Sequence, residues 1–284
     1  MKIIYHNDND GYCSAAIAYK FYSESKIFDK IELIEMDYDK VFPIETITKS
    51  ETIVIVDFSL SEEMWLKLFE KTDNIVWIDH HKSAIEKYKC ASHLNGIRNT
   101  TKAACELTWE YFYNHIHVPL AVAYVGDYDT WKFKYKNTKD FHSGLKIIDC
   151  EPNSNIWNTL LSFDDDANEL MVVILENGQV INEYIEQDDR ECIKRLAYIA
   201  EFEGLELLCC NSIKGSSVFG GNDSNFKICS THSWDGKQWK VSLYSSDPEV
   251  DCSKIALKFG GGGHKGAAGF HCENLPFTFI RKFK

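Results

Sequence analysis

Residues 2–22 read KIIYHNDNDGYCSAAIAYKFY and predict a β-strand, a polar turn and an α-helix in immediate succession. Lys2 to Tyr5 is short and apolar at its centre, as strands are, and Tyr12 to Tyr22 is rich in alanine and aromatic residues, as a following helix would be. The turn between them, His6 to Gly11, contains one histidine and two aspartates. In open α/β sheets, ligands bind beyond the carboxyl ends of the strands, which is where this turn would lie.

The same arrangement recurs further along the chain. Three more apolar runs predict strands: Ile31 to Met36, Thr52 to Val56 and Ile75 to Ile78. Asp57 directly follows the third of the four strands, and Asp79, His80 and His81 follow the fourth. Helices are expected over Ser61 to Lys71, Ala103 to Tyr113 and Pro119 to Val125. This alternation predicts an α/β fold with a doubly wound, mainly parallel sheet over residues 1–150.

The second half of the chain has a different pattern. Residues 151–200 are mostly polar and predict a helical connector. Residues 201–284 predict a smaller α/β domain, with strands at Leu205 to Cys209, Ser216 to Phe219, Phe226 to Ser230 and Trp239 to Tyr244, and a helix at Cys252 to Phe259. We expect the active site in the cleft between the two domains.

Composition limits the classes of function. A chain of 284 residues with 44% hydrophobic residues can bury a sizeable core, and no apolar run is long enough for a signal peptide or membrane span, so a cytoplasmic protein without a membrane partner is expected. The ten cysteines are scattered and predict reduced thiols. A net charge of −12 argues against binding of long duplex nucleic acid and favours a short oligonucleotide or dinucleotide. The oligomeric state is open, a homodimer included.

The polar strand ends predict a metal site. Parallel strands would bring His6, Asp8, Asp10, Asp57 and His80 to one edge of the sheet, where so many carboxylates would repel one another without a cation. Carboxylate and imidazole ligands without thiolates suit Mn(II) better than structural zinc. A single aspartate after a strand is more often a turn former or helix cap, but the coincidence at three strand ends favours two divalent ions.

These residues resemble the motifs of a known family. His6 to Gly11, Asp57 and Asp79-His80-His81 resemble the first three motifs of DHH phosphoesterases, and the GGGH segment, Gly261 to His264, resembles the motif of their associated C-terminal domain. The resemblance implies one ion held by His6, Asp8 and Asp57, and a second held by Asp10, Asp57, His80 and a fourth-motif aspartate. It also implies that His81 lies beside the scissile phosphate and that Asp79 orients the neighbouring imidazole.

The fourth motif is open between two carboxylates in VGDYDTW, residues 125–131. Asp127 fits if the preceding helix sets the register, as in RecJ-type exonucleases. Asp129 fits if Asp129 and Thr130 are matched to the Asp-Thr pair of nano-RNases. We favour Asp127 slightly at this point.

Two further segments are candidates for phosphate binding. Gly261, Gly262, Gly263 and His264 would let the backbone approach a phosphate closely, although a flexible turn after a helix explains glycines equally simply. Arg98 precedes a predicted helix and could bind phosphate, with Thr100 or Thr101 as a simple helix cap on the other interpretation.

The expected function is two-metal hydrolysis of short oligonucleotides to nucleoside monophosphates. Cyclic dinucleotides and 3′,5′-phosphorylated nucleotides are alternatives within the same chemistry. A nucleotide-binding regulatory module is the alternative without turnover, but such a module would be expected to lack an acidic ligand, and every expected position is filled here.

Overall fold

The computed structural model describes residues 1–114, 117–220 and 225–283. The chain divides into two compact units, Met1–Asn182 and Glu183–Lys284. No helix among the described residues combines the length and the apolar character needed to cross a bilayer.

The first unit is built on a four-stranded parallel sheet with the strand order β2-β1-β3-β4. The strands are β1 (Lys2–His6), β2 (Glu32–Met36), β3 (Ile53–Val56) and β4 (Ile75–Ile78). Three of them are apolar runs buried on both faces, as parallel sheets covered by helices require. The prediction of a parallel, doubly wound sheet is confirmed.

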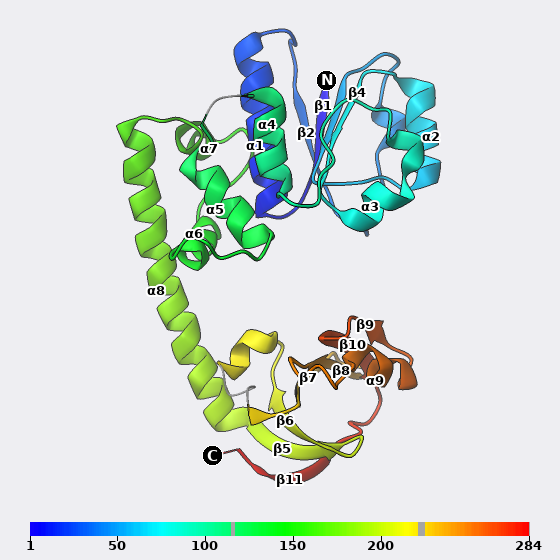
Figure 1. Ribbon diagram of the computed structural model, residues 1–284, viewed down its shortest axis with the longest axis vertical. Coiled ribbons are helices and arrows are strands. Elements are labelled where there is room, and N and C mark those ends of the chain that lie inside the picture. Colours follow the sequence, from blue (N-terminus) through cyan, green and yellow to red (C-terminus); the bar gives the residue numbers. More distant parts are fainter. Residues whose placement is uncertain (115–116, 221–224, 284) are drawn as a thin grey trace. The chain divides into compact units, whose positions relative to one another are not determined.

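Helices cover both faces of this sheet (Figure 1). On one face α1 (Asn9–Ser25) and α4 (Ala104–Phe112) pack against Ile3, Tyr5 and Val54. On the other face α2 (Glu62–Lys71) and α3 (Lys82–Lys87) cover a core in which Trp65 and Trp77 are almost fully buried. A further helical layer contains α5 (Leu120–Asp129), α6 (Thr138–Leu145) and α7 (Asn155–Leu160).

The long helix α8 (Asp165–Leu196) crosses the boundary between the units and occupies most of the segment predicted as a connector. Its stripe of buried residues, which includes Met171 and Ile174, packs into the helical layer of the first unit. Gly144 and Gly178 permit close contact there, because a Cβ atom at Gly178 would lie 1.7 Å from the carbonyl oxygen of Asp140.

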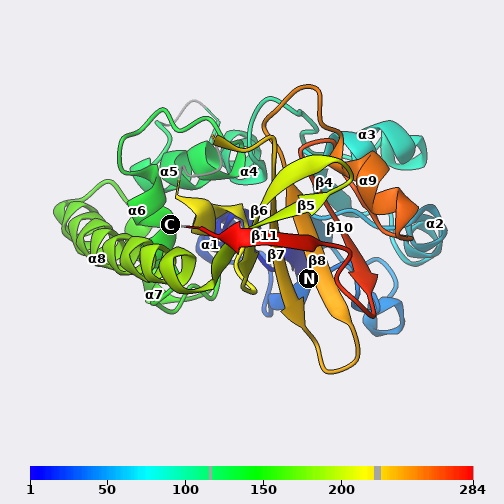
Figure 2. The same ribbon diagram turned by 90° about the horizontal axis from the view of Figure 1, so that it is seen from below.

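The second unit contains a seven-stranded sheet of order β11-β5-β6-β7-β8-β10-β9, in which only β6 and β7 are parallel (Figure 2). Its strands are β5 (Ala197–Phe202), β6 (Leu205–Asn211), β7 (Ile228–Trp234), β8 (Trp239–Tyr244), β9 (Gly262–Gly263), β10 (Ala267–Cys272) and β11 (Thr278–Lys282). Helix α9 (Cys252–Lys258) packs on the sheet through Cys252 and Ala256. The predicted smaller C-terminal α/β domain is confirmed.

One predicted strand of the second unit is wrong. Ser216–Phe219 forms the 3₁₀-helix η3, and Gly220 follows it in the left-handed conformation, with φ of 54°. Val218 and Phe219 are buried, so the apolar signal was that of a packed turn and not of a strand.

Candidate metal centre

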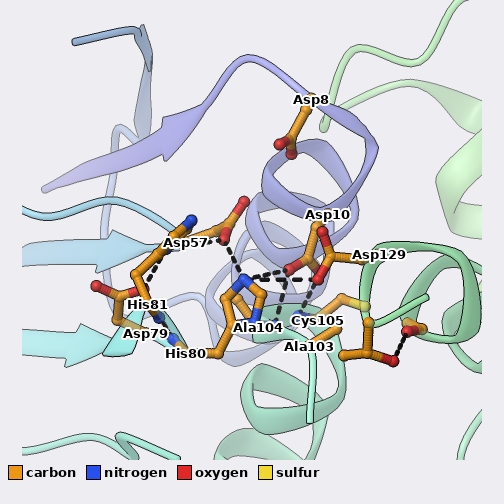
Figure 3. A network of polar contacts seen from close by, with 12 residues as sticks. Asp8, Asp10, Asp57, Asp79, His80, His81, Ala103, Ala104, Cys105 and Asp129 are labelled. Carbon is orange, nitrogen blue, oxygen red and sulfur yellow. Dashed lines mark hydrogen bonds and ion pairs between the residues drawn. The ribbon is translucent and has the colours of Figure 1, made fainter. Parts of the chain in front are cut away.

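The strand order creates a switch point between β1 and β3. The chain leaves β1 to form β2 on one side and later forms β3 on the other side of β1, so the connections diverge there. Open α/β sheets bind ligands at such points. His6 ends β1, Asp57 directly follows β3, and Figure 3 shows Asp10, Asp57, His80 and Asp129 pointing toward one another at this edge.

The turn after β1 uses Asp8 in two ways. Its Oδ1 accepts a hydrogen bond of 2.9 Å from the backbone N–H of Gly11 and so caps α1, while its Oδ2 lies 2.8 Å from His6 Nδ1. Burial raises the pKa of Asp8, but the hydrogen bonds from His6 and Gly11 outweigh this effect and bring it to about 2. Asp8 is therefore a helix cap whose second oxygen is available to a ligand.

Asp57 is a buried carboxylate without a donor. Only 1% of its surface is exposed, and neither oxygen accepts a hydrogen bond from an N–H or O–H group of the described residues. Three imidazole nitrogens lie near it: His80 Nε2 and His81 Nδ1 at 3.3 and 3.8 Å from Oδ1, and His6 Nδ1 at 3.9 Å from Oδ2. A buried charge in this state is costly unless a cation neutralises it.

Asp10 links the centre to the start of α4. Its two carboxylate oxygens accept hydrogen bonds of 2.8 and 2.7 Å from the backbone N–H groups of Ala104 and Cys105. The N-terminus of a helix favours negative charge, so this contact helps to keep Asp10 in place as an anion. Oδ2 also lies 3.6 Å from His80 Nε2.

The donor atoms form three groups in which all members lie within 4.8 Å of one another. These groups are His6, Asp8 and Asp57; Asp57, His80 and His81; and Asp10, His80 and Asp129. Two groups share Asp57 and two share His80, so the arrangement resembles two adjacent sites with common ligands. Mixed oxygen and nitrogen donors without a thiolate fit a pair of divalent ions of the Mn(II) or Mg(II) type.

The electrostatics of the cluster also fit a bound cation. Burial, together with neighbouring carboxylates, raises the pKa of Asp57 well above its usual value, and burial raises the pKa of Asp10. Burial and the charges of Asp10 and Asp8 raise the pKa of Asp129 to about 8. Divalent ions would remove this penalty by supplying positive charge.

Asp79 supports the imidazole of His81. It is fully buried, and its Oδ1 accepts from the backbone N–H groups of His80 and His81 at 2.7 and 3.1 Å and lies 2.8 Å from His81 Nδ1. This hydrogen bond with Asp79 is the main cause that raises the pKa of His81, whose side chain is 36% exposed. His81 is thus held by Nδ1 and is accessible to solvent.

Known proteins show the same domain. A profile of the DHH family, N-terminal domain, matches residues 1–126. This part of the chain is a DHH-family domain. An uncharacterized protein of Acanthamoeba polyphaga mimivirus, R106, is 28% identical over 305 positions, which cover 98% of this chain and 70% of that protein.

Solved structures share the fold beyond the DHH domain. The DHH domain of a member of the s1p family of ribosomal proteins has a TM-score of 0.55 at 15% identity, covering 98% of this chain and 82% of the other. Exonuclease RecJ bound to manganese has a TM-score of 0.53 at 13% identity, covering 95% and 85%. At this level of identity the likeness concerns the fold alone.

The structure places Asp129 in the cluster of the DHH domain and Asp127 outside it. Both lie on α5, which runs four residues past the predicted end at Val125, and residues two apart on a helix face different sides. Asp129 Oδ2 lies 3.5 Å from His80 Nε2. The carboxylate of Asp127 accepts from the backbone N–H groups of Lys134 and Tyr135, so the geometry favours Asp129 over Asp127 as the fourth-motif candidate.

Paired substitutions distinguish these two aspartates. We expect Asp129→Asn to weaken Mn(II) binding at least about tenfold with little loss of stability, because it removes one ligand from a cluster of repelling charges. We expect Asp127→Asn to retain Mn(II) binding but to lower the free energy of unfolding by about 1 to 3 kcal/mol, because buried hydrogen bonds are lost. Calorimetric Mn(II) titration and urea denaturation measure both quantities, and the reverse pattern would assign the ligand to Asp127.

Arg98 does not reach the cluster. Its guanidinium donates to four backbone carbonyl groups, those of Trp77, Ser92, Leu94 and Asn95, at 2.8 to 3.2 Å. It also lies over the ring of Trp77, with Cζ 5.6 Å from the centroid. These contacts favour a structural role for Arg98, in which it ties the segment after α3 to β4, over the phosphate contact considered from the sequence.

We expect Arg98→Lys to destabilise the protein without a specific effect on substrate. An ammonium group cannot reproduce the planar fork, so the free energy of unfolding should fall by about 1 to 3 kcal/mol while KM stays within about twofold. Chemical denaturation and steady-state kinetics below the melting range test this. A large rise in KM in a variant of unchanged stability would restore Arg98 as a substrate ligand.

His142 is a neighbour of the centre that the sequence did not reveal. Its Nδ1 lies 3.1 Å from Nδ2 of Asn9, the residue between Asp8 and Asp10. Its ring stacks on Tyr128 with centroids 3.5 Å apart and planes at 7°. Burial lowers its pKa to about 4, so His142 is neutral and acts as a support for the metal-binding turn.

The GGGH segment lies in the second unit, where structural reasons account for part of it. Gly261 and Gly263 contact β10 so closely that a Cβ atom would lie 2.1 Å from Gly269 O and 2.5 Å from Ala268 Cα respectively. Gly262 has nothing within 4 Å of such an atom, and His264 is exposed. The residues just beyond, Gly266 and Ala267, help to line a pocket of about 840 Å³ within this unit. The backbone of the segment is thus paired with β10, while the space beside Gly262 is open and the imidazole of His264 is exposed.

Proposed function

We propose that this protein is a two-metal phosphodiester hydrolase that converts short oligonucleotides to nucleoside monophosphates. The observation that carries the proposal is Asp57, a buried carboxylate that accepts no hydrogen bond from the described residues and that belongs to two groups of potential metal ligands. The DHH domain and the manganese in the similar structure of exonuclease RecJ support the same chemistry and Mn(II) as the ion.

The distances support a ligand assignment with one shared carboxylate. His6, Asp8 and Asp57 would hold one ion, and Asp10, Asp57, His80 and Asp129 would hold the other, with Asp57 shared. Two divalent ions lower the pKa of a water molecule and neutralise the charge that develops on a phosphoryl group in transfer. Asp10 keeps its ligand oxygens oriented through the N–H groups of α4.

His81 would act on the phosphate itself. Asp79 holds Nδ1, which leaves Nε2 for a substrate, and the hydrogen bond with Asp79 raises the pKa of His81 and so favours its protonated form. A protonated imidazole in this position can donate to a phosphate oxygen and then transfer its proton to the leaving oxygen. Gly262 and His264 of the second unit would bind a terminal phosphate, because the space beside Gly262 is open and the His264 imidazole is exposed.

The net charge favours a short substrate. At −12 the chain lacks the excess of lysine and arginine that binding of long nucleic acid requires. Cyclic dinucleotides contain the same diester, and the geometry of the ligands does not discriminate against them.

The test is hydrolysis of a labelled RNA pentamer with Mn(II), with cyclic di-AMP as a parallel substrate. We expect stepwise release of mononucleotides, loss of activity with chelator, and recovery on addition of Mn(II). His264→Ala should raise KM while retaining metal binding, and Lys265→Ala is the matched control next to it. Nucleotide binding without turnover of either substrate would replace the proposal with a regulatory module.

A further inference from the structure

The loop between α5 and α6 combines aromatic and basic residues directly after the metal ligand Asp129. Residues 130–139 read TWKFKYKNTK, with aromatic residues and lysines in alternation, four lysines in total and no acidic residue. This stretch stands out in a chain with a net charge of −12. A positive groove lined with aromatic side chains is the usual surface for single-stranded nucleic acid.

The backbone of this loop is held in an unfavourable conformation. Trp131 and Phe133 have φ of 56° and 47°, in the left-handed region that residues with bulky side chains rarely adopt. Asp127 holds them there, since its carboxylate accepts from Lys134 N and its carbonyl oxygen accepts from Lys132 N at 3.0 Å. Strain of this kind is retained mainly at functional sites.

The result of this strain is an exposed indole. Trp131 is 69% exposed, and its ring contacts that of Phe133 edge-on, with centroids 4.8 Å apart. Glycine would adopt this left-handed backbone more easily, so the backbone conformation does not explain a tryptophan here. Burial does not explain it either, because most of the indole is exposed. Only Thr130 lies between Asp129 and Trp131 in the sequence, which limits the distance between the Cα atoms of these two residues to about 7.6 Å.

The lysines around this indole carry unused charge. Lys132, Lys134, Lys136 and Lys139 are all exposed, and none forms an ion pair with a carboxylate in the part of the chain that the structure describes. Lys132 Nζ donates to the carbonyl oxygen of Thr101, and Lys139 lies 5.5 Å from the ring centroid of Phe133. Positive charge therefore lies around the aromatic surface without a protein counter-ion.

We infer that Trp131 stacks on the base of the nucleotide next to the scissile phosphate, while Lys134 and Lys136 contact its phosphodiester backbone. This inference rests on the proposed function and adds to it the subsite that recognises the base. Stacking on an indole accepts any base, so the subsite selects single-stranded over paired substrates and does not select a sequence.

Kinetics with base-free substrates test the subsite. The full-length protein is compared on a dinucleotide and on the same dinucleotide with an abasic residue at one position or the other. In the native protein, we expect the base at one of the two positions to matter more: KM for the natural dinucleotide should be about 5-fold to 150-fold lower than KM for the dinucleotide that lacks this base. This range is typical of one stacked base. Trp131→Gly should remove this preference, leave kcat within about twofold and leave the melting temperature unchanged or higher. Trp131→Phe should retain part of the preference.

Matched controls separate stacking from general effects. Trp234 is 51% exposed in the second unit, so Trp234→Ala should retain the full base preference. Lys136→Gln should reduce the dependence of KM on salt for natural and abasic substrates alike. Calorimetric binding of AMP and of ribose 5-phosphate to the native protein and Trp131→Gly gives a readout without turnover.

The outcomes distinguish the inference from the proposed function. If Trp131→Gly raises KM equally for natural and abasic substrates, or changes neither, the stacking surface is refuted even though hydrolysis persists. If no diester is hydrolysed but Trp131→Gly weakens binding of AMP and not of ribose 5-phosphate, the surface stands and the hydrolase is refuted.

Discussion

Asp57→Asn is expected to abolish Mn(II) binding and lower kcat/KM at least about a thousandfold, yet to make the metal-free protein more stable. Asparagine has nearly the same volume and tolerates the left-handed backbone of Asp57, where φ is 53°. It removes one buried carboxyl group from a cluster of acids that are costly to ionise together and offers N–H donors to its neighbours, so the free energy of unfolding without metal should rise by about 1 to 3 kcal/mol at pH 8. Urea denaturation in chelator and calorimetric titration with Mn(II) measure the two effects.

The opposite signs of these effects make the prediction specific. A residue that merely supports the fold would lose both stability and activity. Asp73→Asn is the matched control, because Asp73 is an exposed aspartate that no metal-ligating group includes. A metal-free Asp57→Asn protein that is less stable than the native one, or that still binds Mn(II) tightly, would contradict the assignment of Asp57 as the shared ligand.

Chelation is expected to destabilise the native protein increasingly as the pH rises from 5 to 8. The pKa of Asp129 is about 8 in the folded, metal-free protein, against an ordinary value of 3.8, and the pKa values of Asp10 and Asp57 are also raised. Between these pH values the folded state retains protons that the unfolded state has lost. The metal-free protein therefore loses stability as pH rises, by up to about 1.4 kcal/mol per pH unit for each such group.

The metal-loaded protein should not show this loss, because its ligands are ionised throughout. The difference in melting temperature between samples with Mn(II) and with chelator should thus be small at pH 5 and large at pH 8, and Mn(II) binding should release protons near pH 7. Asp129→Asn should show a weaker dependence on pH. A difference in melting temperature that is constant over this range would show that the carboxylates are already ionised without metal.

The sequence predicted the elements that end at the centre because the signal was local. Each strand was a short apolar run followed at once by Asp57, or by Asp79 and its two histidines, and parallel strands must bring such ends to one edge. The conformation of Asp57 was not predictable, since its left-handed backbone depends on the surrounding fold and no glycine marks the position.

The sequence left roles open where the orientation of a side chain decides them. Asp127 and Asp129 are chemically the same, and only the continuation of α5 past Val125 turns them to different sides. Arg98 has a guanidinium group, which is a common phosphate ligand, but this group donates its hydrogen bonds to four nearby carbonyl groups. The contact of His142 with Asn9 joins residues 133 positions apart, a distance at which a single sequence carries no pattern.

The carboxylate of Asp10 has a consequence for hydrogen exchange. Its oxygens accept hydrogen bonds from the first N–H groups of α4, and Oδ2 also faces His80 in the cluster. The start of this helix and a bound ion would therefore interact with the same carboxylate. When the ion leaves, the raised pKa of Asp10 favours its protonation, and a protonated acid is a weaker acceptor for backbone N–H groups. Deuterium uptake at Ala104 and Cys105 should therefore report the occupancy of the centre, from a position at the start of a helix.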